Sequence, residues 1–262
     1  MNRHSLFNWA LVAIYYVLVV APHKTFGTLL NRFAFRDMGM SRDQYNLLVI
    51  AIAGLGLLMY LVFFFRKTTS LEDRGTVWGY MLFNVLLATI VINILFVINI
   101  EVVHFPQYAM FALLIFPLSK NYNATLIWTT IAGAIDEAYQ NFYLAPKDTG
   151  YYDWNDVITN LIGGVFGLLL LRSAGVSNRK ISPFYTSKSI YGAIVLMVLV
   201  LVLHLCGVLS IGPSDYPYQM VSKELSGFWQ TVHPNVTYHV VRPLEGLLIT
   251  IGLWGVYRKI GG

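Results

Sequence analysis

Three short polar clusters interrupt an otherwise apolar sequence, and their residue types are those of acid–base chemistry. In the first cluster, Glu101, His104 and Tyr108 recur at intervals of three and four positions, which places them on one face of a helix. A histidine beside carboxylates can exchange a proton near neutral pH. The cluster therefore offers a general acid or base with hydrogen-bonding groups one turn away.

The second cluster, in the stretch DEAYQNF, pairs two adjacent carboxylates with an amide. Asp136 lies four positions before Gln140 and Glu137 lies three before it, so both acids are about one helical turn from the amide. Partial burial tunes the acidity of a carboxyl group and lets it act as an acid or a base. Either acid could therefore exchange a proton with a bound molecule.

The third cluster, in the stretch DWNDVITNLIGGVFG, opens an apolar block. Asp153, Asp156 and Asn160 again recur at intervals of three and four, and Gly163 and Gly167 continue down the same helix. Glycines at such spacing let helices approach closely in an apolar environment. We expect the glycines to serve packing and the polar residues to face a cavity.

Each cluster also has a purely structural explanation. Asp136 and Glu137 could end a helix in the lipid headgroup layer, and Asp156 with Asn160 could place an anion at the positive end of a helix dipole. His104 could be an interfacial histidine with satisfied hydrogen bonds. The shared side and spacing of the clusters favour one outward-facing pocket.

The elements that position these residues are indicated by composition. The chain has 262 residues, of which 56% are hydrophobic and only 12% are charged, whereas a soluble domain carries about 25% charged residues. The apolar residues form long blocks, which is typical of a polytopic membrane protein. The net charge of +5 does not indicate nucleic acid, because the basic residues lie mostly between the blocks. The single cysteine, Cys206, excludes an intramolecular disulfide.

Eight apolar blocks predict an all-α bundle of about eight transmembrane helices, since ~20 residues cross a bilayer. The first block lacks a small-residue cleavage site, so we expect it to be retained. The fourth to sixth blocks are short and need their polar ends to reach bilayer length. The blocks are roughly Leu6–Ala21, Leu47–Phe65, Trp78–Ile98, Phe105–Ser119, Ala124–Ile135, Val157–Leu171, Ile190–Ile211 and Pro243–Tyr257.

The distribution of Lys and Arg predicts the orientation. With both termini in the cytoplasm, eleven of these residues lie in inner segments and seven in outer segments. The short loops 66–77 and 172–189 favour this arrangement most clearly. All three polar clusters and the loop 212–242 then fall on the outer face.

Two outer segments have features of their own. His23–Asn46 alternates aromatic and basic residues and is either a short interfacial helix or an ordinary basic loop. Pro213–Arg242 is long and aromatic, which predicts a packed cap over the outer face. Its NVT triplet at Asn235 matches a glycosylation site by pattern only.

The stretch from Glu101 to Leu171 resembles the VanZ-like family of small bacterial membrane proteins. Three motifs carry the resemblance in the family's order and spacing: HFPQY from His104, DEAYQ from Asp136 and DVITNLIG from Asp156. Residues 78–172 would form the family core, flanked by two-span extensions at 1–77 and 173–262. The resemblance implies a location in the bacterial cytoplasmic membrane and a role at the cell envelope. The family's namesake is associated with resistance to the antibiotic teicoplanin.

Two positions depart from the family pattern. The basic residue between the second and third motifs is usually Arg and is Lys147 here, which lacks the planar fork that grips an anion at two points. The residue after the first acid is usually Lys and is Val102 here. The biochemical activity of the family is poorly defined, so the resemblance locates a site more than it names a reaction.

We therefore expect an enzyme that acts on a lipid-linked or envelope substrate among membrane lipids. Glu137, His104 and Asp156 are the candidate catalytic residues. The candidate substrate-binding residues are Asp136, Gln140, Tyr108, Lys147, Asn160, Arg242 and Glu245. A divalent cation held by the acids with His104, His233 and His239 stays open, although no HExxH or CxxC signature supports it.

Two other functions remain open. A non-enzymatic resistance protein could bind a glycopeptide or a cell-wall precursor, with Tyr216, Tyr218 and Trp229 of the outer loop on sugar or lipid faces. A transporter would use the scattered polar residues of the spans, but the sequence shows no inverted repeat and no pair of broken helices. Those residues are Asn84, Asn93, Asn99, Arg242 and Glu245.

Overall fold

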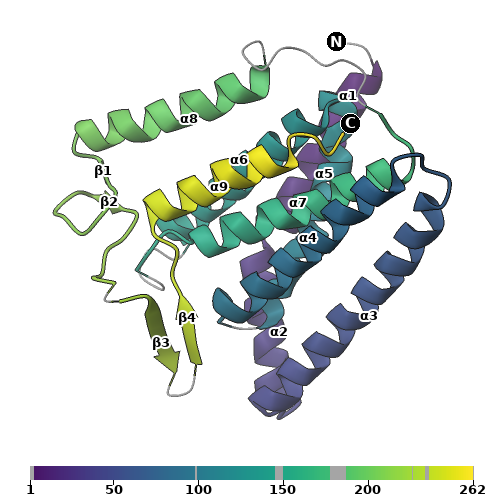
Figure 1. Cartoon of the computed structure of the whole chain (residues 1–262). Helices are drawn as coiled ribbons and strands as arrows, with labels where there is room; N and C mark the ends of the chain where they lie inside the picture. The colour runs from purple at the N-terminus through teal and green to yellow at the C-terminus, as the bar shows by residue number, and fades with distance from the viewer. Residues whose placement is uncertain are drawn as a thin grey trace.

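The structure is a computed structural model that describes residues 3–97, 99–144, 150–177, 187–225, 227–233 and 236–261. It is mostly helical, with a few short strands (Figure 1). The α-helices are α1 (Arg3–Tyr15), α2 (His23–Arg32), α3 (Arg42–Thr68), α4 (Arg74–Ile94), α5 (His104–Ser119), α6 (Tyr122–Tyr139), α7 (Trp154–Ser173), α8 (Lys188–Leu205) and α9 (Pro243–Tyr257).

Shorter elements join these helices. Two two-stranded sheets, β1 with β2 in parallel and β3 with β4 antiparallel, lie between α8 and α9. The π-helical turns are Tyr16–Val20, Phe33–Asp37 and Gln140–Leu144, the 3-10 turn is Asn99–Val103, and the strands are β1 (Leu209–Ser210), β2 (Tyr218–Gln219), β3 (Trp229–His233) and β4 (Val236–His239).

The all-α expectation is confirmed in its broad form, because six of the described helical stretches are apolar and long enough to cross a membrane. Each of the eight predicted blocks carries a helix, but α9 has only 15 residues, and α6, which ends in the acidic cluster, is not among the six. The six stretches are Leu6–Asp37, Arg42–Thr68, Arg74–Ile94, Ile100–Ser119, Trp154–Ser173 and Lys188–Leu205.

Two block ends differ from the sequence-based expectation, and for one segment the structure decides between the two alternatives. The helix of the third block, α4, ends at Ile94. The helix of the seventh block, α8, ends at Leu205, because Gly207 turns the chain there with a φ of 71°. The segment His23–Asn46 is not an ordinary loop: α2 continues the line of α1 (Figure 1). The helical stretch Leu6–Asp37 has 32 residues, about 48 Å at the usual rise per residue.

Polar side chains begin several helices by accepting otherwise unpaired backbone N–H groups. Ser41 and Gln44 form a capping box at the start of α3. The Asn121 side chain accepts from the Ala124 N–H at 2.9 Å before α6, and Asp153 accepts from the Asn155 N–H at 3.0 Å before α7. The third polar cluster therefore fixes where α7 starts.

Helix α7 lies at the centre of the bundle, where it packs against α3, α4, α5, α6 and α9. In the most apolar 18-residue window of α7, 78% is buried, a larger share than in the other membrane-length stretches. Hydrogen bonds from neighbouring helices reach its backbone: Tyr60 donates to the Phe166 carbonyl at 2.7 Å, and Asn84 donates to the Ile162 carbonyl at 3.2 Å. Such interhelical bonds supplement packing between apolar helices.

Glycines let α7 approach its neighbours, as the sequence predicts. A Cβ atom at Gly163 would lie 2.9 Å from the carbonyl oxygens of His104 and Phe105, and one at Gly167 would collide with the Ala109 carbonyl, all on α5. On the α6 side, a Cβ atom at Gly164 would lie 2.8 Å from Thr129 Cγ2. The backbones of α5 and α7 are therefore in direct contact.

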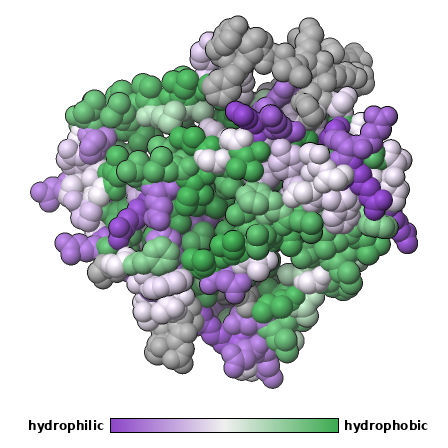
Figure 2. Space-filling model, viewed as in Figure 1, coloured by the Kyte–Doolittle hydropathy of each residue, from purple (hydrophilic) through white to green (hydrophobic). Residues whose placement is uncertain are grey.

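The surface of the bundle is largely apolar. In Figure 2, hydrophobic residues occupy the middle of the visible face, and hydrophilic residues gather towards its upper right and lower left. Helix α8 lies along the edge of the bundle (Figure 1) and contacts it where Gly192 meets the Trp128 ring. Its other face is exposed and consists of large apolar side chains. A bilayer would cover such a surface.

We predict that Gly167→Ala destabilises the fold, because the added methyl group collides with the Ala109 carbonyl and forces α5 and α7 apart. Overpacking of this kind costs about 1–3 kcal/mol. Thermal unfolding in detergent, followed by tryptophan fluorescence, should show a lower Tm. Gly54→Ala on α3 is the matched control, since a Cβ atom there meets nothing within 4 Å. A Tm for Gly167→Ala equal to that of the control would contradict the close packing.

Candidate functional site

His104, the first residue of α5, lies between two polar residues of α7. Its Nδ1 donates to Asn160 Oδ1 at 2.8 Å, and its Nε2 is 3.5 Å from Asp156 Oδ2. His104 and Asn160 are buried, whereas the Asp156 side chain is 16% exposed. With Nδ1 bonded to the amide, the Nε2 nitrogen is the one that can exchange a proton with Asp156. Asp156 is thus the member of this trio closest to solvent.

The meeting of three helices makes this contact possible. A Cβ atom at Gly133 of α6 would lie 3.0 Å from both Cβ and Nδ2 of Asn160, so the glycine leaves room for the amide. Gly163 of α7 likewise leaves room for the backbone carbonyl of His104. Any larger residue at Gly133 would push Asn160 out of line with His104.

The acids of the second cluster lie close to this trio. Tyr108 donates to Asp136 Oδ2 at 3.5 Å, and Gln140 Nε2 donates to Asp136 Oδ2 at 3.3 Å and to Glu137 Oε1 at 3.0 Å. All four side chains are buried. The Tyr108 ring lies 6.5 Å from the His104 ring, centroid to centroid, which links these acids to the trio. We call the set His104, Tyr108, Asp136, Glu137, Gln140, Asp156 and Asn160 the polar cluster.

Two tyrosines that the sequence analysis did not select hold α6 in place beside the polar cluster. Tyr16, which follows α1, donates to the Ala132 carbonyl at 3.0 Å, and Tyr152, just before α7, donates to the Ala134 carbonyl at 2.6 Å. They therefore bracket Gly133 from two different parts of the chain. In the sequence, Tyr16 is visible only as a tyrosine inside the first apolar block. Residue spacing relates positions on the same helix, so it could not predict a contact between Tyr16 and α6.

Asn155 is a second residue that the sequence analysis missed. Its Nδ2 donates to the carbonyls of Leu95 at 3.1 Å and His239 at 2.8 Å, and its Oδ1 accepts from the Val241 N–H at 2.9 Å. One buried amide thus joins the end of α4, the start of α7 and the chain that enters α9. It lies next to Asp156 but points to another helix face.

Residues 207–242, which we call the cap, pack over the start of α7, as their aromatic composition predicts. The Tyr152 N–H donates to the Met220 carbonyl at 2.5 Å, and Tyr151 pairs with Val221 in an antiparallel bridge. The hydroxyls of Tyr151 and Tyr238 lie 3.0 Å apart. Burial raises the pKa of both phenols above the usual value, so both stay protonated and able to donate at neutral pH.

Arg242 and Glu245 make their contacts within the cap. The Arg242 guanidinium donates to the carbonyls of Leu225 at 3.2 Å and Gly227 at 3.1 Å, and its backbone N–H donates to Glu245 Oε2 at 3.1 Å. Glu245 Oε1 also lies 3.1 Å from His239 Nε2. The structure thus gives both residues a role in fastening the cap, apart from the polar cluster.

Of the other candidate residues, Lys147 and the side chain of His233 lie outside the described part of the chain. His239 is engaged by Glu245 and by the Phe228 carbonyl, which lies 2.8 Å from its Nδ1. Among the described residues, no three His, Cys, Asp or Glu side chains are grouped closely enough to hold a metal ion.

We predict that His104 and Asn160 are energetically coupled in the folded protein. Loss of a buried hydrogen-bond partner costs about 1–3 kcal/mol, and residues in contact couple by about 0.5–3 kcal/mol. A double-mutant cycle of His104→Ala and Asn160→Ala, read from the free energy of unfolding in detergent, should show this coupling. As the control pair, His104→Ala with Tyr257→Phe should be additive, since Tyr257 bonds to Asn84 instead. Additivity in both cycles would refute the contact.

Comparisons with known protein families, with curated proteins and with solved structures find no match for this chain. The resemblance to the VanZ-like family therefore stays a prediction carried by its three motifs.

Proposed function

We propose that the chain is a multi-pass protein of the bacterial cytoplasmic membrane, with both termini in the cytoplasm and the polar cluster at the outer face. The six apolar helices of membrane length and the apolar surface support embedding in a bilayer. The N- and C-terminal ends lie near each other in Figure 1, and the cap strands lie at the opposite end of the bundle. The charge bias of the loops supports this orientation.

The natural cysteine tests this orientation without any mutation. Cys206 is exposed and directly follows α8 at the cap end. We expect a membrane-impermeant maleimide to label it in right-side-out vesicles and not in sealed inside-out vesicles. Cys206→Ser combined with Ser70→Cys, in the exposed turn between α3 and α4, should give the reverse pattern. The same pattern for both proteins would reject the orientation.

We further propose that the polar cluster is the active site of an enzyme that modifies a lipid-linked or cell-envelope substrate by acid–base chemistry. The observation that carries this proposal is the placement of His104 between Asn160 and the partly exposed Asp156. Asn160 orients the imidazole, and Asp156 stabilises the imidazolium that forms when Nε2 accepts a proton.

The reaction would pass one proton through His104. Nε2 takes it from an attacking hydroxyl group or water and returns it to the leaving group, so the imidazole ends the cycle as it began. Glu137 serves as a second acid or base, held by Gln140 at 3.0 Å. Tyr108 and Gln140 donate to the two acids of the second motif and hold them beside the imidazole. A site of this kind at the outer face suits a molecule whose tail stays in the bilayer.

We predict that His104→Gln and Glu137→Gln each lower turnover by at least ~100-fold, the usual contribution of a general acid or base. Purified protein would be incubated with lipid-linked cell-wall precursors, and products would be followed by mass spectrometry. Glu245→Gln is the matched control, because this acid of the first turn of α9 bonds to His239 and Arg242 of the cap. Unchanged turnover in both cluster variants would show that these residues are not catalytic.

The alternative function is a resistance protein that binds an envelope precursor or a glycopeptide without converting it. One observation favours it: Phe228 and Trp229 of the cap are about half exposed, at 53% and 51%, and meet edge to face. Exposed rings of this kind suit sugar or lipid faces. Calorimetric binding of a precursor that stays unchanged on long incubation with the wild-type protein would favour binding over catalysis.

A further inference from the structure

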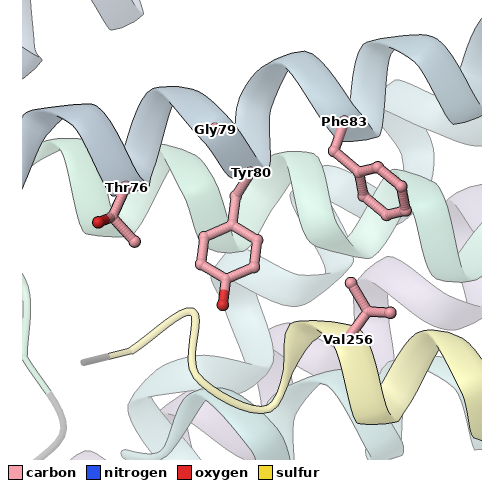
Figure 3. Close-up of a pocket in the computed structure, with 5 residues that line it drawn as sticks. All are labelled: Thr76, Gly79, Tyr80, Phe83 and Val256. Carbon is pink, nitrogen blue, oxygen red and sulfur yellow. The ribbon is translucent and has the colours of Figure 1, made fainter.

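An apolar groove runs along the surface between α4 and α9 (Figure 3). It is a shallow depression, open to the outside, with a volume of about 330 Å³. On α4 the lining residues recur at helical spacing, so one face of the helix forms one wall. The lining residues are Thr76, Gly79, Tyr80, Phe83 and Val256. They lie near the start of α4 and the end of α9, at the end of the bundle opposite the cap.

Packed aromatic rings form the wall of the groove, and a glycine, Gly79, lies in its lining. The Tyr257 ring lies 6.0 Å from the rings of both Tyr80 and Phe83, and its hydroxyl donates to the buried Asn84 at 2.7 Å. Gly79 leaves the groove open, because a Cβ atom there would meet nothing within 4 Å. An occupant would therefore find a shaped apolar surface without ordering any side chain.

The inner end of the groove carries exposed positive charge. Arg258 and Lys259 directly follow α9, two and three positions after Val256 of the groove lining. Both side chains are exposed, and within the described residues neither forms an ion pair.

One of the two acids between α3 and α4 is already paired. Asp73 forms an ion pair with Arg172 of α7, and the other acid is Glu72. Arg74 stacks over the Phe65 ring of α3, 5.1 Å from its centroid. The mouth of the groove is thus apolar inside and positive at its rim.

We propose that this groove binds an anionic phospholipid of the inner leaflet, with one acyl chain along α4 and the phosphate at Arg258 and Lys259. The apolar lining suits the chain, and basic side chains between helices at the cytoplasmic end attract anionic headgroups. The proposal rests on the membrane orientation proposed above but not on the chemistry of the polar cluster. It assigns a binding site to the inner face of the bundle, where none of the sequence motifs lies.

Lipid titration of the full-length protein tests this site. Delipidated protein in detergent would be titrated with phosphatidylglycerol and with phosphatidylcholine of identical acyl chains, and bound lipid would be counted by native mass spectrometry. We expect at least a 10-fold preference for phosphatidylglycerol. In Arg258→Gln/Lys259→Gln the affinity for phosphatidylglycerol should fall about 30-fold, equivalent to ~2 kcal/mol for two cations.

Two further variants separate the groove from general charge. Arg66→Gln/Lys67→Gln removes the same charge from the end of α3 and should leave lipid affinity within about 3-fold of the wild type. Gly79→Leu fills the groove and should weaken both lipids. Equal binding of the two lipids by the wild type, or an equal loss in the α3 variant, would overturn the proposal. Cysteine labelling reports on orientation independently, so such a result would leave the outer-face site untouched.

Discussion

The close approach of α7 to α5 and α6 is the constraint on which the rest of the structure depends. At Gly163 and Gly167 the helix backbones meet without intervening side chains, and Gly133 gives the same freedom on the α6 side. Only at this separation can His104 at the start of α5 reach Asn160, which projects from α7. Because these glycines have no side chain, the three helices approach closely enough for their polar groups to meet.

The same contacts explain how such a cluster can exist inside an apolar bundle. Buried carboxylates and imidazoles are unfavourable unless they are hydrogen bonded or paired. Here Gln140 bonds to both Asp136 and Glu137, while Asn160 and Asp156 flank the imidazole. Placement at helix ends leaves Asp156 partly in contact with solvent. The polar cluster thus combines three acids, an imidazole and a phenol in one contact network.

Sequence patterns predicted the parts of this arrangement that lie on single helices. Spacing along α7 identified the face that carries Asp156, Asn160 and Gly163, and hydropathy located the helices within a few residues. The contacts that these patterns missed join segments that are distant in the sequence. Tyr16 and Tyr152 bond to α6 from separate parts of the chain, and neither lies on α6 itself. Arg242 and Glu245 were grouped with the site by residue type, whereas their geometry ties them to the cap.

The cap and the polar cluster share one anchor, the first turn of α7. Asn155 bonds to two residues near the end of the cap, His239 and Val241, and the next residue after Asn155 is Asp156. The cap therefore cannot shift at this point without moving the backbone that positions Asp156 against His104. Asp156 is also the most exposed of the trio. The anchor of the cap and the contact that flanks the imidazole are thus built from neighbouring residues.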